Sequence, residues 1–155
     1  MKTDQLHRWM TLGANVGVLI GLILLVAELS QNAAMMRAQT RNELSVGIVD
    51  LFARVAENPQ LASLRRRADA GEDLSPDEAY QYEIITRAFF RYWENVHYQY
   101  RQELYDEVEF SRQREAWRGY AETSPALTQF WCAQKGGFSP DFVEEFDALL
   151  PAGAC

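Results

Sequence analysis

The sequence predicts an all-α protein in which a single N-terminal transmembrane helix continues into a long extramembrane helix and packs with a small helical bundle. Three observations support this fold class. An uncharged apolar stretch stands near the start of the chain, no segment sustains the alternation of a β-strand, and Ser-Pro helix starts recur in the second half. We divide the chain into a short tail at 1–8, a transmembrane helix at 9–29 and an α-helical extramembrane domain at 30–155.

The stretch from Trp9 to Ala27 contains no charged residue. A helix of about 20 residues crosses a hydrocarbon core of about 30 Å, because each residue adds about 1.5 Å. Trp9 suits one membrane interface, and Arg8 and Glu28 flank the span. A secretory signal peptide is the alternative, but its apolar region is normally shorter and no small-residue cleavage site follows Ala27. We therefore expect an uncleaved anchor in contact with membrane lipids.

Three glycines stand four residues apart within this stretch, at Gly13, Gly17 and Gly21. Residues four apart share one face of a helix, so the three form a groove without side chains. Small residues let two backbones approach closely in lipid, where burial of apolar side chains gives little driving force. The pattern predicts packing against another transmembrane helix, from an identical chain or a larger complex, and Asn15 could hydrogen-bond across an interface. The alternative is that glycine is simply common in membrane helices.

Apolar residues continue beyond Glu28 at spacings of three and four, and no proline occurs before Pro59. This pattern predicts one helix from about residue 4 to residue 56. Its apolar stripe needs a cover, either the rest of this chain or a neighbouring copy. The stripe consists of Leu29, Ala33, Met36, Leu44, Ile48, Leu51 and Val55.

Five shorter helices are expected after it, at 59–70, 76–105, 109–122, 125–135 and 140–149. The best start signal is Ser75-Pro76-Asp77-Glu78, which combines a serine cap, a proline in the first turn and a glutamate at the capping-box position. The Ser-Pro pair recurs at Ser124 and Ser139. Each of these serines is predicted to cap the helix that follows it.

The segment from Arg87 to Glu107 is rich in aromatic residues on two sides of a helix, which is typical of the central helix of a bundle. One apolar stripe includes Phe89 and Val96, and the other includes Tyr80, Ile84 and Tyr98. These side chains could fill an aromatic core or line a ligand pocket. The residues considered for either role are Tyr92, Trp93, Glu94, Asn95, Tyr98, Tyr100, Trp117 and Trp131.

The pair Glu94-x-x-His97 has the spacing found in di-iron four-helix bundles. Only one such pair exists, however, and the other histidine, His7, belongs to the tail. Arg87 and Arg91 can form ion pairs on the same helix, which favours a structural role. We therefore expect no metal, no cofactor and no catalytic residues, and a net charge of −7 argues against a nucleic-acid partner.

Two cysteines, Cys132 and Cys155, lie far apart in the sequence and show no metal-ligand spacing. A disulfide fits if the domain lies outside the cytoplasm. The favoured interpretation is a buried apolar cysteine and a free tail thiol. The positive-inside rule does not decide the orientation, because Lys2 and Arg8 before the span balance Arg37 and Arg41 after it.

Three segments resemble an uncharacterised group of small bacterial proteins that have one N-terminal transmembrane helix and an all-helical soluble domain. They are "VAELSQNAAMMRAQ", "FFRYWENVHYQYRQELYDE" and the closing "W…GGFSPDFVEEFD". The resemblance covers nearly the whole chain and implies a bacterial inner-membrane protein with a cytoplasmic domain. It implies no activity, cofactor or catalytic residue.

Together these features predict a non-enzymatic, single-pass membrane protein. We expect it to act as an oligomeric scaffold or as an accessory subunit of a larger inner-membrane complex, and to associate through its glycine-bearing span. The alternative is a membrane-anchored sensor or small-ligand-binding domain that uses the aromatic cluster.

Overall fold

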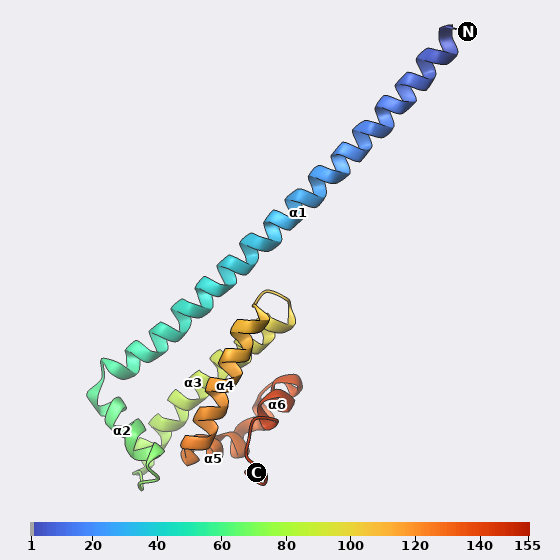
Figure 1. Cartoon of the computed structure of the whole chain (residues 1–155). Coiled ribbons are helices and arrows are strands. Elements are labelled where there is room, and N and C mark those ends of the chain that lie inside the picture. Colours follow the sequence, from blue (N-terminus) through green and yellow to red (C-terminus); the bar gives the residue numbers. More distant parts are fainter. Residues whose placement is uncertain (1) are drawn as a thin grey trace. The chain divides into compact units, whose positions relative to one another are not determined.

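The computed structural model describes residues 2–155, and their regular secondary structure is entirely helical (Figure 1). The all-α prediction is therefore confirmed. Met1 of the predicted tail lies outside the described residues, and the first helix already begins at Lys2. The helices are α1 (Lys2–Ala56), α2 (Pro59–Asp69), α3 (Pro76–Arg101), α4 (Glu107–Thr123), α5 (Pro125–Gln134), the 3₁₀ turn η1 (Lys135–Gly137) and α6 (Pro140–Asp147).

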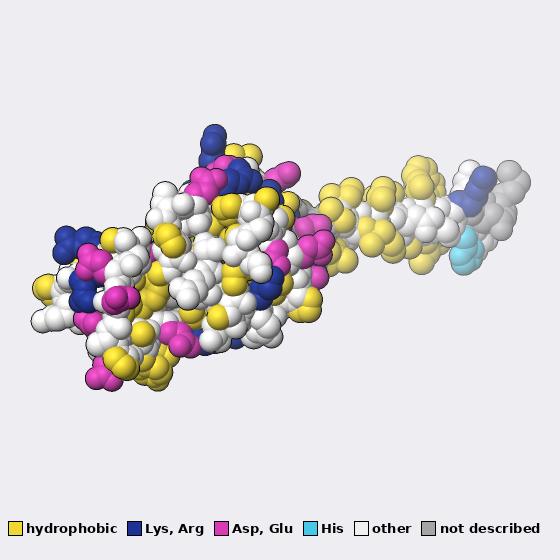
Figure 2. Space-filling view, turned by 90° about the horizontal axis from the view of Figure 1, so that it is seen from below, with side chains coloured by type: hydrophobic (Ala, Val, Ile, Leu, Met, Phe, Trp, Pro, Cys, Tyr) yellow, Lys and Arg dark blue, Asp and Glu magenta, His cyan; other side chains and the backbone are white. Residues whose placement is uncertain are grey.

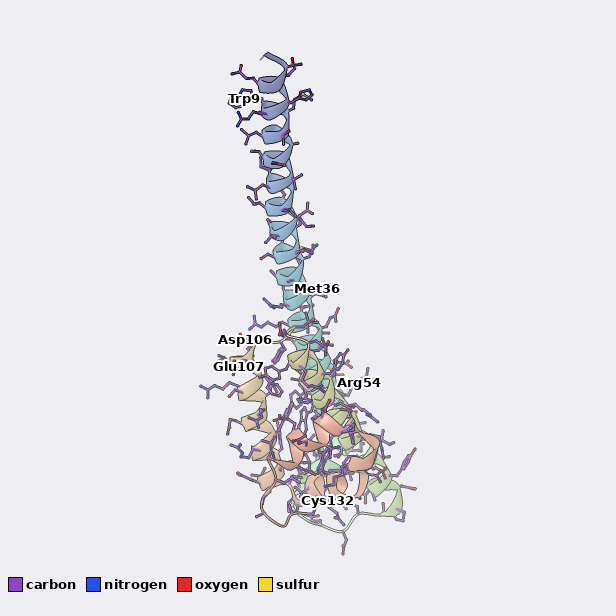
Figure 3. All side chains as sticks on the ribbon, turned by 90° about the vertical axis from the view of Figure 1, so that its right-hand side faces the viewer. Trp9, Met36, Arg54, Asp106, Glu107 and Cys132 are labelled. Carbon is purple, nitrogen blue, oxygen red and sulfur yellow. A yellow bond between two sulfur atoms is a disulfide. The ribbon has the colours of Figure 1, made fainter. Side chains whose placement is uncertain are left out.

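The chain divides into two units, residues 1–39 and residues 40–155. The first unit is helical wherever it is described, and its large apolar side chains are exposed along its length (Figure 3). Trp9 near its start is 69% exposed, and Met36 near its end is 54% exposed. Figure 2 shows hydrophobic side chains along this helix, whereas acidic and basic groups are scattered over the surface of the helical domain. Exposure of this much apolar surface is what a lipid-facing segment requires.

The second unit folds around an aromatic core at which α3, α4, α5 and α6 meet (Figure 1). The core is closed by partly buried Tyr92, Tyr100, Tyr105, Val143 and Leu150. A smaller cluster of Leu64, Ala68 and Tyr82 joins α2 to α3. Helix α3 packs against α2, α4, α5 and α6, so the prediction of a central helix is confirmed. Its predicted second apolar stripe is not buried, because Tyr80, Ile84 and Tyr98 are exposed.

The part of α1 in this unit, residues 40–56, is partly covered by α3. Leu44 belongs to the aromatic core, and the ring of Phe52 lies 5.6 Å from that of Phe89. A Cβ added at Gly47 would lie 3.8 Å from the ring of Tyr92, in ordinary contact. In the distal half of the predicted stripe this chain buries Leu44, and Ile48, Leu51 and Val55 are half-buried.

Two of the three predicted serine caps are confirmed. Ser75 accepts a hydrogen bond from the amide of Glu78 and completes a capping box, and Ser124 accepts one from the amide of Leu127. Ser139 makes no capping hydrogen bond with its side chain, so the third prediction is wrong. Proline still occupies the first turn of α6, where its missing N–H costs nothing.

The boundary between α3 and α4 also differs from the prediction. Helix α3 ends at Arg101 rather than at residue 105, because Glu103 adopts a left-handed conformation with φ of 59°. Helix α4 then begins two residues earlier than expected, at Glu107. Asp106 caps it by accepting hydrogen bonds from the amides of Val108 and Glu109.

Candidate functional site

The apolar part of α1 is the one described helix that is long and apolar enough to cross a membrane, with a mean hydropathy of 2.3 over its best 18-residue window. None of this window is buried by the rest of the structure. A core helix of a soluble protein would instead hide its apolar residues. Length, composition and exposure all fit a membrane span.

Gly13, Gly17 and Gly21 lie on this helix with open space above each of them. A Cβ built on any of the three would find no atom within 4 Å. Their absence of side chains is therefore not required by packing inside the chain, and their backbone conformation does not require glycine either, because all three lie within a regular helix. Asn15 is also exposed and lies off the glycine face.

The predicted tryptophans form the centre of the aromatic core rather than the wall of a cavity. Trp117 and Trp131 are fully buried, and Trp93 is 3% exposed. Trp93 stacks on Trp117 at 5.7 Å between ring centroids, and Phe90 stacks on Trp131 at 4.9 Å. Burial and ring packing of this density leave these side chains filling space.

The indole N–H groups of the two fully buried tryptophans differ in whether they have a hydrogen-bond partner. Trp131 donates its Nε1 hydrogen to Asp147 at 2.7 Å. The Nε1 of Trp117 is the one buried side-chain polar atom without a hydrogen-bond partner in the described part of the chain. Its indole ring packs nearly perpendicular to the rings of Phe110 and Phe142, at interplanar angles of 82° and 86°.

The remaining aromatic candidates surround this core. Tyr92 and Tyr100 are partly buried against it, and burial raises the pKa of Tyr92 to about 12. The Tyr100 ring stacks on Phe110 at 4.0 Å. Tyr98 and Asn95 are exposed, and Asn95 accepts a hydrogen bond from Gln99. The predicted cluster thus separates into a buried tryptophan core and a tyrosine periphery.

Glu94 joins α3 to the start of α6. Its carboxylate accepts hydrogen bonds from Arg91 at 2.6 Å and from the Ser139 amide at 2.7 Å, and Arg91 also donates to the Gly137 carbonyl at 2.8 Å. Burial raises the pKa of Glu94, but hydrogen bonds from Ser139 and Arg91 outweigh it, so the pKa lies below its ordinary value. Glu94 therefore satisfies the backbone N–H of the N-cap residue of α6, as the glutamate of a capping box does within its own helix.

His97 is buried and packs against the rings of Phe110 and Phe142. Its charged neighbour is not one of the groups that bind Glu94. Its Nε2 lies 4.0 Å from Glu145, which also pairs with Arg114. Burial lowers the pKa of His97 more than Glu145 raises it, so the ring is neutral at pH 7. Within residues 2–155, no group of three His, Cys, Asp or Glu side chains is placed to hold a metal ion.

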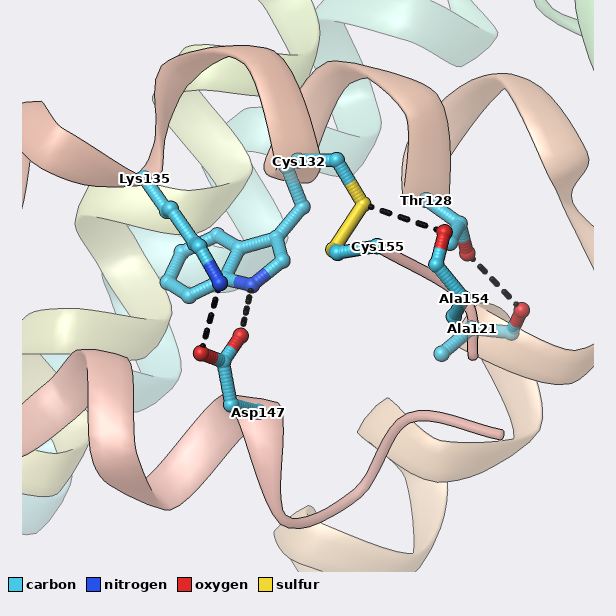
Figure 4. The surroundings of a disulfide bond; sticks show 8 residues. Ala121, Thr128, Cys132, Lys135, Asp147, Ala154 and Cys155 are labelled. Carbon is cyan, nitrogen blue, oxygen red and sulfur yellow. Dashed lines mark hydrogen bonds and ion pairs between the residues drawn. A yellow bond between two sulfur atoms is a disulfide. The ribbon is translucent and has the colours of Figure 1, made fainter. Parts of the chain in front are cut away.

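Cys132 and Cys155 are joined by a disulfide, which corrects the interpretation of a free tail thiol (Figure 4). The bond closes a loop that contains η1 and α6. Trp131, which directly precedes Cys132, and Lys135, three positions after it, both donate to the carboxylate of Asp147 at 2.7 Å. Sequence reasoning missed Asp147, because nothing local to it indicates a buried indole partner.

A surface cleft of about 540 Å³ lies between the α2–α3 turn and α5. Leu74, Ala126 and Phe130 line it together with the acidic residues Glu72 and Glu83. Arg67 and Arg87 already pair with these carboxylates. None of the predicted tryptophans lines this cleft.

No protein-family model, curated protein or solved structure matches the chain. The resemblance to small bacterial single-span proteins therefore stays a prediction.

Proposed function

We propose that this protein is a non-catalytic, single-span membrane subunit that associates with another transmembrane helix through its glycine face. The membrane is proposed to be the bacterial inner membrane, and the partner is a second copy of the chain or a larger complex. In either arrangement the helical domain serves as a scaffold held at the membrane surface.

One observation carries this proposal: open space lies above Gly13, Gly17 and Gly21 on an exposed apolar helix. A lipid tail would contact leucine or valine as well as it contacts glycine. A second helix backbone, by contrast, gains dispersion contacts and Cα–H contacts only where side chains are absent. The aromatic groups offer less to a ligand, because the three tryptophans fill the domain core.

The test is a Gly17→Leu substitution in the full chain, extracted in mild detergent. Since no atom lies within 4 Å of the added Cβ, the leucine fits the single chain and perturbs only a partner. We expect the wild type to elute as an assembly larger than one chain, and Gly17→Leu to weaken that assembly at least tenfold. Size-exclusion chromatography with light scattering measures the mass, and mass spectrometry identifies any co-purifying protein.

Val26→Leu provides the matched control. Residue 26 lies nine positions from Gly17, which is 2.5 helical turns, so its side chain points to the opposite face. It should leave both mass and co-purifying proteins unchanged, and circular dichroism should show the same helix content in all three proteins. An unchanged assembly in Gly17→Leu would remove the basis of the proposal.

A further inference from the structure

The Cys132–Cys155 pair is positioned by the fold around it. The two Cα atoms are 5.4 Å apart, within the usual range for a disulfide, although 23 positions separate the residues. Asp147 ties the end of α6 to Lys135 at the start of η1 (Figure 4). It also accepts a hydrogen bond from Trp131 in α5. The tail then turns back, with the Ala154 amide donating to the Pro151 carbonyl at 3.1 Å. These contacts hold α6 and the tail close to α5 in addition to the disulfide.

We infer that this disulfide forms in the cell and that the helical domain faces an oxidising compartment, which for a bacterial inner membrane is the periplasmic side. Structural disulfides persist outside the cytoplasm and are reduced within it. The domain is thus placed on the side of the membrane opposite to the cytoplasmic side that the sequence resemblance implies. This placement depends on the membrane anchor of the proposed function and is independent of the glycine face.

The charges near the span do not oppose this orientation, because Lys2 and Arg8 before it balance Arg37 and Arg41 after it. Basic residues close to a span favour the cytoplasmic side, and acidic residues such as Glu28 have little influence. The disulfide, and not the charges, therefore assigns the domain to its side of the membrane.

The oxidant is the disulfide of a thiol–disulfide oxidoreductase. Cys155 is exposed and Cys132 is half-buried, so the Cys155 thiolate attacks the partner's disulfide first and forms a mixed disulfide. The Cys132 thiolate then attacks the Cys155 sulfur and releases the partner's reduced dithiol. Two protons leave the cysteines, and their two electrons reduce the partner's disulfide. The pair is therefore a modification site for an oxidising partner.

The first experiment measures the oxidation state in cells. The full chain is expressed, thiols are trapped by acid precipitation, and a polyethylene-glycol maleimide is added with or without a reductant. We expect no addition without the reductant and two additions per chain after reduction. Addition of two maleimides without a reductant would overturn the disulfide.

The second experiment measures sidedness with Cys132→Ser, which leaves Cys155 as a free, exposed thiol. A membrane-impermeant maleimide should label Cys155 as fully in intact spheroplasts as in lysed cells. The control is Thr3→Cys in a Cys132→Ser/Cys155→Ser background, which should be labelled only after lysis. Labelling of Cys155 only after lysis would overturn the periplasmic placement, whatever the result with Gly17→Leu.

Discussion

Opening the Cys132–Cys155 disulfide should cost the helical domain a measurable part of its stability. The bond spans 23 positions and closes a loop that contains α6. Cross-linking a loop of this length lowers the entropy of the unfolded chain by about 11 cal/mol/K, which corresponds to about 3.4 kcal/mol at 25 °C. Phe142 and Phe146 on α6 are fully buried, so the loop contributes to the core rather than lying on the surface.

The assay is urea unfolding of the full chain in detergent, followed by tryptophan fluorescence, with Cys132→Ser, Cys155→Ser and the double variant compared with the wild type. Removing either sulfur opens the loop, so all three variants should lose the same stability, about 2–4 kcal/mol. For a domain of this size the urea midpoint then falls by about 1–3 M. Reductant should lower the wild-type midpoint to that of the variants and leave the variants unchanged.

The reasoning would be refuted by a wild-type midpoint that reductant leaves unchanged. A different kind of failure would be a loss confined to Cys132→Ser. The half-buried Cys132 would then matter through its packing, because an open loop would affect Cys155→Ser equally. Comparing the two single variants therefore separates chain entropy from local packing.

Two further predictions concern carboxylates outside the membrane. In urea unfolding, Glu94→Gln should lower the free energy of unfolding by about 1 kcal/mol and Glu94→Ala by about 2 kcal/mol. The glutamine amide keeps an acceptor for the Ser139 N–H, whereas alanine leaves that N–H without one. Equal losses in the two variants would contradict this. Hydrogen bonds from Arg67 and Ser75 lower the pKa of Glu78 from 4.5 to about 2. Its ionised form therefore stabilises the fold above about pH 4.5, and this contribution is lost as the pH falls towards 2. The unfolding midpoints of wild type and Glu78→Gln should differ at pH 7 and converge near pH 2, and a constant gap would be evidence against the ion pair.

The sequence predicted the helices well because their ends are determined by local chemistry. The capping box at Ser75 and the cap at Ser124 need only residues three positions away. The start of α4 was missed although a signal was present, since Asp106 is followed three positions later by Glu109. The end of α3 carried no such signal. Glycine or asparagine usually marks a left-handed residue after a helix, and here the residue is Glu103.

The structural partners in the domain could not be predicted in the same way. Glu94 binds the Ser139 amide 45 positions away, and Cys132 meets Cys155 only because α6 folds back between them. Such pairs depend on tertiary packing, for which spacing along one helix gives no information. The spacing of Glu94 and His97 even suggested metal ligands, whereas the fold gives the two side chains different partners.

Two parts of α1 differ in what covers their apolar side chains. In residues 40–56, the domain itself covers the stripe at Leu44. In the apolar stretch, lipid is a sufficient partner for leucine and valine side chains. Lipid gives no reason for Gly13, Gly17 and Gly21, which leave a backbone bare where side chains would fit. Association within the membrane is the explanation that we propose for the glycines, and Gly17→Leu tests it more directly than any change in the domain.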